Sequence, residues 1–304
     1  MIPAYAELHC LSNFSFQRGA SHPEELVAQA AAFGYAAIAL TDECSLAGVV
    51  RAHRALQALP GEHRPRLIIG SELQLADGPC IVLLATTRAG YGQLSRLITQ
   101  ARRAAVKGTY QLTRAMLDAA CSAGTQRDCL ALLVPPAAFP PAAFPPSGRP
   151  PLTAIDTAST TPEGPQASPA HQALEADAVW LAQRYPGRAW MAVTVRLDGR
   201  DRARITLLRR IARSAGIPAV AASGALMHAR ERRPLADVMT ALRLHCSVAE
   251  AGLALAANAE QRLHDRDTLA RRYPPALLAE TLAVAERCTF SLDELRYEYP
   301  AELV

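Results

Sequence analysis

The chain has 304 residues, of which 50% are apolar, 20% charged and 5% aromatic. This composition is typical of a globular protein, and it excludes a wholly disordered chain, a collagen-like repeat and a disulfide-dense mini-protein. The formal net charge of +4 does not by itself indicate nucleic-acid binding, because such binding needs basic residues concentrated on one surface.

The seven cysteines indicate a reducing compartment. Their number is odd and no pair has C-x-x-C spacing, so the sequence predicts neither a disulfide framework nor a zinc ribbon. The amino terminus lacks the charged and apolar regions of a secretory signal, and the apolar runs are shorter than the roughly 20 residues that a membrane span needs. We therefore expect a cytoplasmic protein with no membrane partner.

Seven short apolar segments predict β-strands: Ala4–Cys10, Ala36–Thr41, Arg66–Leu73, Cys80–Ala85, Leu130–Val134, Trp190–Leu197 and Pro218–Ala222. Helical patterns lie between them: Glu24–Phe33, Leu46–Leu59, Tyr91–Ala105, His171–Tyr185 and Ala203–Ala215. Strands that alternate with helices favour a mainly parallel sheet, and seven of them suggest a barrel. Functional residues of such barrels lie on the loops after the carboxyl ends of the strands.

A proline-rich stretch interrupts this pattern. Residues 135–169 hold 11 of the 22 prolines, and proline lacks the amide N–H and fixes φ. We therefore expect an extended, disordered insertion between two βα units. Two interpretations stay open: an insertion tolerated on the surface, or a proline-rich ligand for a partner protein.

The last third of the chain is predicted to be helical, over 234–244, 258–273 and 275–288. We expect a barrel over 1–245 and a helical segment over 246–304. The final residues, Tyr297-Glu298-Tyr299-Pro300, form no clear end of a fold. The sequence therefore suggests a piece of a longer protein.

Candidate site residues stand at the ends of the first three predicted strands, at His9, Glu43 and Glu72. Imidazole and carboxylate groups bind zinc, manganese or iron, and a metal pair can activate water for phosphoester hydrolysis. These three residues are the candidate metal ligands. The neighbouring Asp42 is better suited to capping a loop or the next helix.

Five segments match motifs of one known family: Ala6–Phe16 with Arg18–Ser21, Ala39–Gly48, Ile69–Glu72, Gly90–Arg103 and Ala285–Pro300. They resemble the PHP (polymerase and histidinol phosphatase) domain at the amino terminus of bacterial error-prone, C-family DNA polymerases. The resemblance implies an α/β fold, a distorted (β/α)7 barrel of PHP type with a C-terminal helical appendage.

The first motifs of the family are only partly kept. Metal-binding members read D/E-L-H-x-H, and here His9 fills the first histidine position but Leu11 the second. An aspartate usually precedes the glycine of the next turn, where this chain has Arg18. Glu43 stands in place of the histidine of T-D-H, and Glu72 is kept.

The last family motif, D-x-H, falls on Gly224 and Leu226, which cannot bind metal. His228 lies just beyond it as a near-site residue. A catalytic zinc site needs about three protein ligands and a two-metal site needs more. We therefore expect no cofactor, with one weakly bound zinc or manganese ion as the alternative.

The resemblance implies a function for the parent chain. It would be a DNA-directed DNA polymerase, a nucleotidyltransferase acting in DNA repair, damage-induced mutagenesis and translesion replication. This part would have a structural and interaction role that supports the polymerase body, and it would not be catalytic alone. Other expected partners are DNA, through the parent, and mutagenesis accessory proteins.

Two other functions remain open. One is a metal-dependent phosphoesterase or proofreading 3′–5′ exonuclease that uses His9, Glu43 and Glu72. The other is an adaptor that binds partners through residues 135–169. The exposed basic residues of one predicted helix and the turn after it could also contact DNA phosphates. They are Arg96, Arg102, Arg103 and Lys107.

Overall fold

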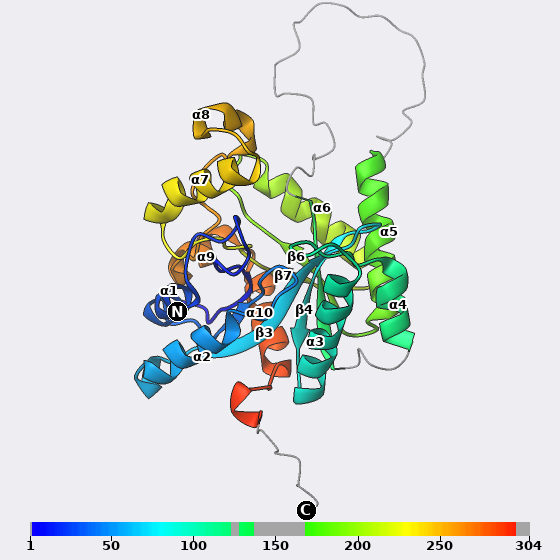
Figure 1. Ribbon diagram of the computed structural model, residues 1–304, viewed down its shortest axis with the longest axis horizontal. Coiled ribbons are helices and arrows are strands. Elements are labelled where there is room, and N and C mark those ends of the chain that lie inside the picture. The colour runs from blue at the N-terminus through cyan, green and yellow to red at the C-terminus, as the bar shows by residue number, and fades with distance from the viewer. Residues whose placement is uncertain (1, 123–127, 137–167, 296–304) are drawn as a thin grey trace, which may run out of the picture.

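The computed structural model describes residues 2–122, 128–136 and 168–295 (Figure 1). The predicted disordered insertion lies for the most part outside these residues, and so does the end of the chain. Within the described part of the chain, no helix is both long and apolar enough to cross a membrane.

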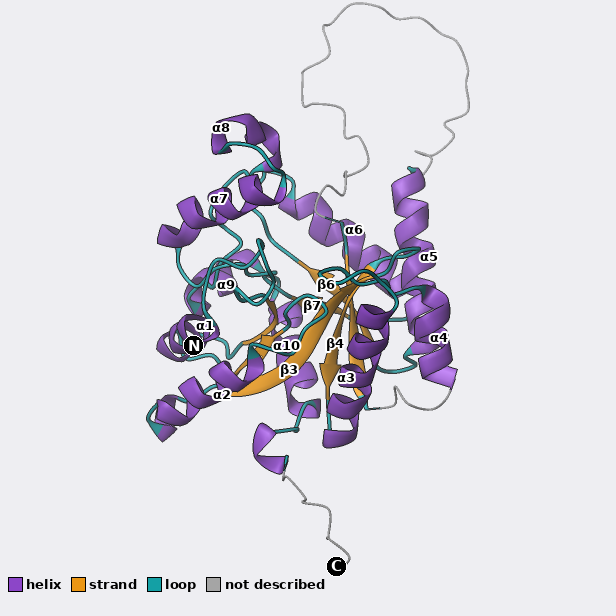
Figure 2. Cartoon of the chain, viewed as in Figure 1, coloured by secondary structure: helices purple, strands orange, loops and turns teal. Residues whose placement is uncertain are grey.

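Seven strands form one sheet in the order of the chain (Figure 2). They are β1 (Ala6–Cys10), β2 (Ala37–Leu40), β3 (Arg66–Gln74), β4 (Cys80–Ala85), β5 (Cys129–Val134), β6 (Ala189–Val193) and β7 (Ala219–Ala221). β4 runs antiparallel to β3 and β5, whereas the other neighbouring strands are parallel. Only residues 75–79 join β3 to β4, which is too short for the crossover that parallel strands need.

Helices surround the strands (Figure 1). They are α1 (Pro23–Ala32), α2 (Val49–Ala58), α3 (Arg88–Arg103), α4 (Arg114–Ser122), α5 (Pro169–Arg184), α6 (Asp201–Ser214), α7 (Arg233–Arg243), α8 (Val248–Ala251), α9 (Arg266–Arg272) and α10 (Pro275–Arg287). Neither α4 nor α8 was predicted. The helix expected over 258–273 begins only at Arg266, because the Asp265 side chain caps it by accepting from the Thr268 N–H at 2.8 Å.

Alternate strand residues build two apolar layers. One set fills the barrel interior, and the other packs between the strands and the helices outside them. The interior set includes Ala6, Leu8, Ala37, Ala39, Ile68, Val82, Leu84, Leu130, Leu132, Trp190, Ala192, Val220 and Ala222. The strands therefore read as nearly continuous apolar runs, as strands buried on both faces do.

Helix α10 fills the gap between the first and last strands. It packs against β1 and β7, and its residues Val284, Ala285 and Cys288 join the interior layer. The Ala6 N–H of β1 donates to the Thr281 hydroxyl at 3.2 Å, so the helix also satisfies the strand edge. The predicted α/β barrel is confirmed. The division at residue 245 stays a prediction, although α10 contributes to the barrel core.

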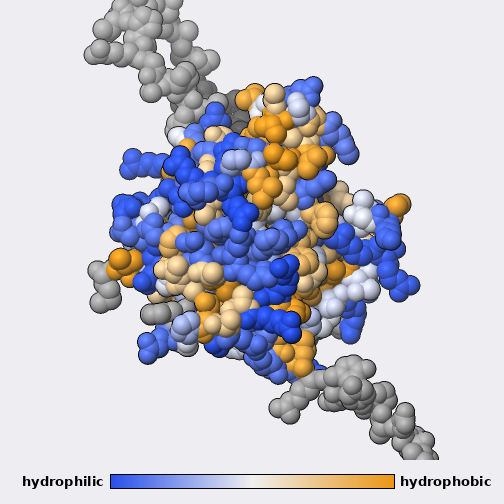
Figure 3. Space-filling view, turned by 60° about the vertical axis from the view of Figure 1, so that its left-hand side comes forward, coloured by the Kyte–Doolittle hydropathy of each residue, from blue (hydrophilic) through white to orange (hydrophobic). Residues whose placement is uncertain are grey.

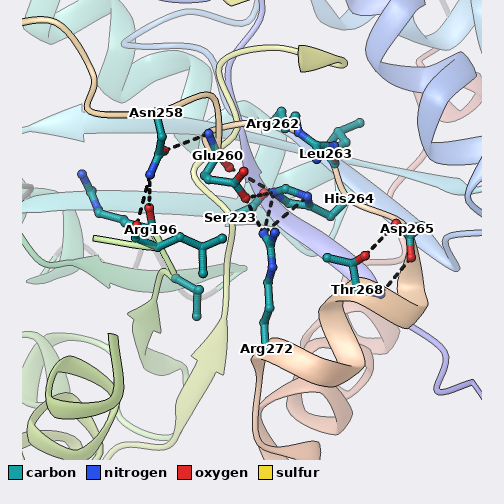
Figure 4. A network of polar contacts seen from close by, with 12 residues as sticks. Arg196, Ser223, Asn258, Glu260, Arg262, Leu263, His264, Asp265, Thr268 and Arg272 are labelled. Carbon is teal, nitrogen blue, oxygen red and sulfur yellow. Dashed lines mark hydrogen bonds and ion pairs between the residues drawn. The ribbon is translucent and has the colours of Figure 1, made fainter. Parts of the chain in front are cut away.

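A polar network ties the segment before α9 to the barrel (Figure 4). The Asn258 side chain donates to the Arg196 carbonyl at 2.7 Å. The Arg272 guanidinium lies 2.6 Å from the Glu260 carboxylate and contacts the buried His264 ring. This loop is therefore held by side chains, in place of the helix that the pattern predicted.

Candidate functional site

The rim of the barrel surrounds a cavity of about 480 Å³ at the carboxyl ends of β1 to β3. Its lining includes His9, Glu43 and Glu72, so the structure brings the three predicted ligands to one place. His9 is the penultimate residue of β1, Glu43 follows β2, and Glu72 lies within β3, which pairs with β2. The topology of neighbouring strands therefore explains why residues far apart in sequence meet here.

A guanidinium group lies between the two glutamates. Arg18 contacts Glu43 Oε2 through Nη1 at 2.7 Å, and the same nitrogen donates to Glu72. The turn that carries Arg18 depends on Gly19, where a Cβ would lie 1.9 Å from the carbonyl oxygen of Ser12. Arg18 thus makes an internal ion pair with two of the three candidate ligands.

His9 supplies the third contact of this cluster. Its Nε2 lies 2.6 Å from Glu72 Oε2, on side chains that are 5% and 6% exposed. Burial alone would raise the pKa of Glu72, but the hydrogen bond from His9 and the charges of His9 and Arg18 lower it from 4.5 to about 2. Glu72 is therefore ionised at neutral pH, and His9 Nε2 donates to it.

Other side chains hold Glu43 in place. The Tyr110 hydroxyl donates to Glu43 Oε1 at 3.0 Å. Burial, followed by the Glu43 charge, raises the pKa of Tyr110, so it stays a donor. The Arg102 guanidinium donates to the carbonyls of Glu43 and Cys44 and lies 5.3 Å from the Tyr110 ring centroid.

The buried Asp42 carboxylate holds the loop that follows β1. It accepts from the Ser12 N–H at 2.8 Å and from the hydroxyls of Ser12 and Ser15 at 2.7 Å each. Burial raises its pKa, and these hydrogen bonds partly oppose the rise. The carboxylate is therefore occupied in shaping the loop that carries Glu43.

The altered ligand positions also line the cavity. Leu11, Gly224 and Leu226 lie on its wall. His9 Nδ1 is buried without a hydrogen-bond partner among the described residues, and a Cβ at Gly224 would lie 3.6 Å from it. His9 Nδ1 thus lies next to Gly224, which has no side chain that could bind a metal together with it.

These residues do not fit a bound metal ion. The Arg18 guanidinium is paired with both carboxylates, and His9 Nε2 contacts one of them. Within the described part of the chain, no group of three His, Cys, Asp or Glu residues has an arrangement that could hold a metal. A second cation beside Arg18 would meet like-charge repulsion.

The remaining candidates are not among the residues that line the cavity. His228 Nδ1 contacts the Ser21 hydroxyl at 2.8 Å, and burial lowers the pKa of this histidine. Arg96 and Arg103 are exposed on α3, seven residues apart and so on one face. Arg102 lies beside them but serves the Glu43 loop, and Lys107 is exposed beyond the helix.

Sequence reasoning did not predict the roles of Arg18 and Glu7. Glu7 is fully buried and accepts from the His9 N–H at 3.0 Å, the Ser223 N–H at 3.1 Å and the Tyr5 hydroxyl at 2.9 Å. It ties β1 to the segment that carries Gly224. A signal for Arg18 was present, because this cation stands where the family pattern has an aspartate.

Residues 7–141 match the family model of the PHP domain. The chain is 57% identical over 301 residues to the error-prone DNA polymerase of Aromatoleum aromaticum, covering 99% of this chain and 25% of that protein. It is 49% identical to the error-prone DNA polymerase of Dechloromonas aromatica, over 100% of this chain and 26% of that one. The chain therefore spans about a quarter of the length of these relatives.

Among solved structures, the chain is similar to a Bifidobacterium adolescentis protein described as a metal-dependent phosphoesterase. The identity is 16% and the TM-score 0.42, over 74% of this chain and 88% of that chain.

Proposed function

This chain carries a PHP domain of the kind found in error-prone DNA polymerases, and from that premise we propose that it supports the polymerase body instead of catalysing a reaction itself. The parent chain would copy damaged DNA in the cytoplasm, as part of DNA repair and translesion synthesis. The identity over 99% of the chain supports the link to that class of polymerase.

The observation that carries the non-catalytic role is the Arg18 ion pair. A catalytic zinc or two-metal site needs carboxylates with free oxygen donors and an open position for water. Here Arg18 binds Glu43 and Glu72, and His9 binds Glu72. The rim is thus a network that links β1, β2 and β3.

The exposed basic residues on and after α3 suit a secondary role toward DNA. Arg96 and Arg103 share one face of α3, and Lys107 follows it. Contacts of this kind would bind phosphates without reading sequence. Accessory proteins of mutagenesis are further proposed partners of the parent.

The alternative, a phosphoesterase or 3′–5′ exonuclease, has one observation in its favour. His9 Nδ1 is buried next to the cavity without a partner among the described residues. One imidazole nitrogen does not make a metal site, and the neighbouring wall positions are Gly224 and the leucines 11 and 226. The alternative is therefore the weaker proposal.

Activity assays on the full parent chain distinguish a supporting domain from a phosphoesterase or exonuclease. We would measure primer extension across a damaged base, and degradation of single-stranded DNA with added zinc or manganese, for the natural chain and Glu72→Gln. If the domain only supports the polymerase body, we expect both proteins to extend the primer and neither to degrade DNA when metal is added. Degradation by the natural chain that Glu72→Gln abolishes would establish the exonuclease instead.

A further inference from the structure

Helix α7 exposes an apolar stripe to solvent. Leu235, Val238 and Leu242 follow a spacing of three and four residues, which places them on one helix face. They are 42%, 44% and 57% exposed. The apolar face of a helix is ordinarily the face that packs against a core, so its orientation here is inverted.

The stripe continues beyond the helix. Three more exposed apolar residues follow it in the chain, Leu244, Val248 and Leu253, and Leu255 beyond them is partly covered. Figure 3 shows apolar side chains gathered toward the top of the molecule, at the height where α7 and α8 lie in Figure 1. Such a gathering marks an interaction surface more often than scattered single residues do.

Helix α7 packs against little of the described structure. In the fully described α7, Ala241 is the one buried residue, and the helix packs chiefly on α8 and the short helix η2 (Arg230–Arg232). Helices of this length gain most of their stability from tertiary packing of the apolar face. A partner over the stripe would supply that packing.

We propose that the α7 stripe, defined as Leu235, Val238 and Leu242, docks onto the remainder of the polymerase chain. This rests on the proposed function, in which the chain is one part of a longer polymerase. The relatives extend well beyond it, since it spans 25% of the protein from Aromatoleum aromaticum. A covalently tethered partner has an effective concentration near the millimolar range, which favours it over a second copy of the chain.

The test uses cysteine accessibility in the full parent polymerase. Val238→Cys places a thiol in the stripe, whereas Val179→Cys on α5 and Val50→Cys on α2 are matched controls. The three valines all lie on helices and are 44%, 43% and 55% exposed. Alkylation of each site is followed by peptide mass spectrometry. We expect the thiol at 238 to react at least about tenfold more slowly than the controls, independently of protein concentration.

Equal reaction rates at the three sites would overturn the proposal. Protection that disappears on dilution would assign the stripe to a second copy, and protection lost on deleting residues 137–167 would assign it to that segment. Both results would also overturn it. Primer extension by the same preparations separates the two proposals. If the polymerase extends the primer but the thiol at position 238 reacts as fast as the controls, the docking proposal is wrong and the polymerase function stands. If the polymerase does not extend the primer, the polymerase function is wrong.

Discussion

The side chain of Arg18 joins two carboxylates that would otherwise repel each other across the rim. Its partners differ in burial, since the Glu43 side chain is 28% exposed and that of Glu72 only 6%. Burial disfavours the charged form of Arg18, but the carboxylates of Glu72 and Glu43 raise its pKa. The Arg18 guanidinium and the buried Glu72 carboxylate therefore each stabilise the charged form of the other.

Replacing Arg18 by methionine should destabilise the folded chain. The change leaves buried Glu72 without its cation, and we expect a loss of about 2–3 kcal/mol near neutral pH, measured by urea unfolding. Arg18→Lys keeps the charge but not the planar fork, so it should lose less.

The loss should depend on pH in a defined direction. The pKa of Glu72 is lowered from 4.5 to about 2, so its contribution to stability is present above about pH 4.5 and disappears as the pH falls toward 2. The difference between the natural chain and Arg18→Met should therefore shrink over that range. Equal differences at about pH 7 and about pH 3 would contradict this account.

Two elements late in the chain hold the barrel together. Helix α10 contributes Thr281, which is fully buried and accepts from the Ala6 N–H of β1. The loop before α9 contributes Glu260 and His264, which meet Arg272 of that helix (Figure 4). Helix α10 thus bonds to the first strand through Thr281, and the loop bonds to α9 through Glu260.

Thr281→Val tests the strand-edge hydrogen bond. Valine has nearly the same shape but no acceptor, so the buried Ala6 N–H is left unpaired. We expect a loss of about 1–3 kcal/mol in chemical unfolding. Thr206→Val on α6 is the matched control, because that exposed hydroxyl bonds only within its own helix. An equal loss for both variants would remove the proposed role of Thr281.

His264 should make stability depend on mild acid. Burial, with the charges of Arg262 and Arg272, lowers its pKa from 6.5 to about 4. Its folded pKa lies below the unfolded value, so the contribution is present above about pH 6.5 and is lost as the pH falls toward 4. We expect the natural chain to lose about 2–3 kcal/mol over that interval through this residue.

His264→Gln should flatten this part of the stability profile, because glutamine keeps a donor for the Glu260 carbonyl but does not titrate. His22→Gln, at an exposed histidine, serves as the control for the substitution itself. Unfolding free energies across the interval give the measurement. An unchanged slope in His264→Gln would show that other groups cause it.

At the scale of the whole molecule, the barrel is completed by a helix. Among the described strands, β1 and β7 form no ladder with each other. An isolated bridge joins Cys10 of β1 to Ala225, which follows β7, and α10 packs against both strands. Its apolar residues join the interior layer of the barrel. The N-terminal strand and the C-terminal helix therefore depend on each other for burial.

Ending the chain at Tyr273 should abolish cooperative unfolding. That truncation removes α10 and exposes apolar residues of the barrel interior to water. A chain that ends at Leu295 keeps the helix and should still unfold in one cooperative transition. Thermal unfolding followed by circular dichroism compares them. A cooperative transition in the shorter chain would show that α10 is dispensable.

Local patterns in the sequence predict the seven strands, most of the helices and the barrel class. Each strand is a short apolar run that can be recognised in the sequence without knowing its neighbours in the sheet. The segments that resemble PHP domains are long. The sequence pattern predicts a helix from residue 258, whereas the cap at Asp265 makes α9 begin at Arg266. The predicted ligands His9, Glu43 and Glu72 also came from local motifs.

The contacts that His9, Glu43 and Glu72 make depend on the folded barrel. Arg18 lies 25 residues before Glu43 and 54 before Glu72, and no local pattern indicates that one guanidinium binds both. The same holds for α10, which lies 275 residues from the strand edge that Thr281 satisfies. Charge pairing and barrel closure depend on distances in space, which the folded strands set and which the order of residues alone does not specify.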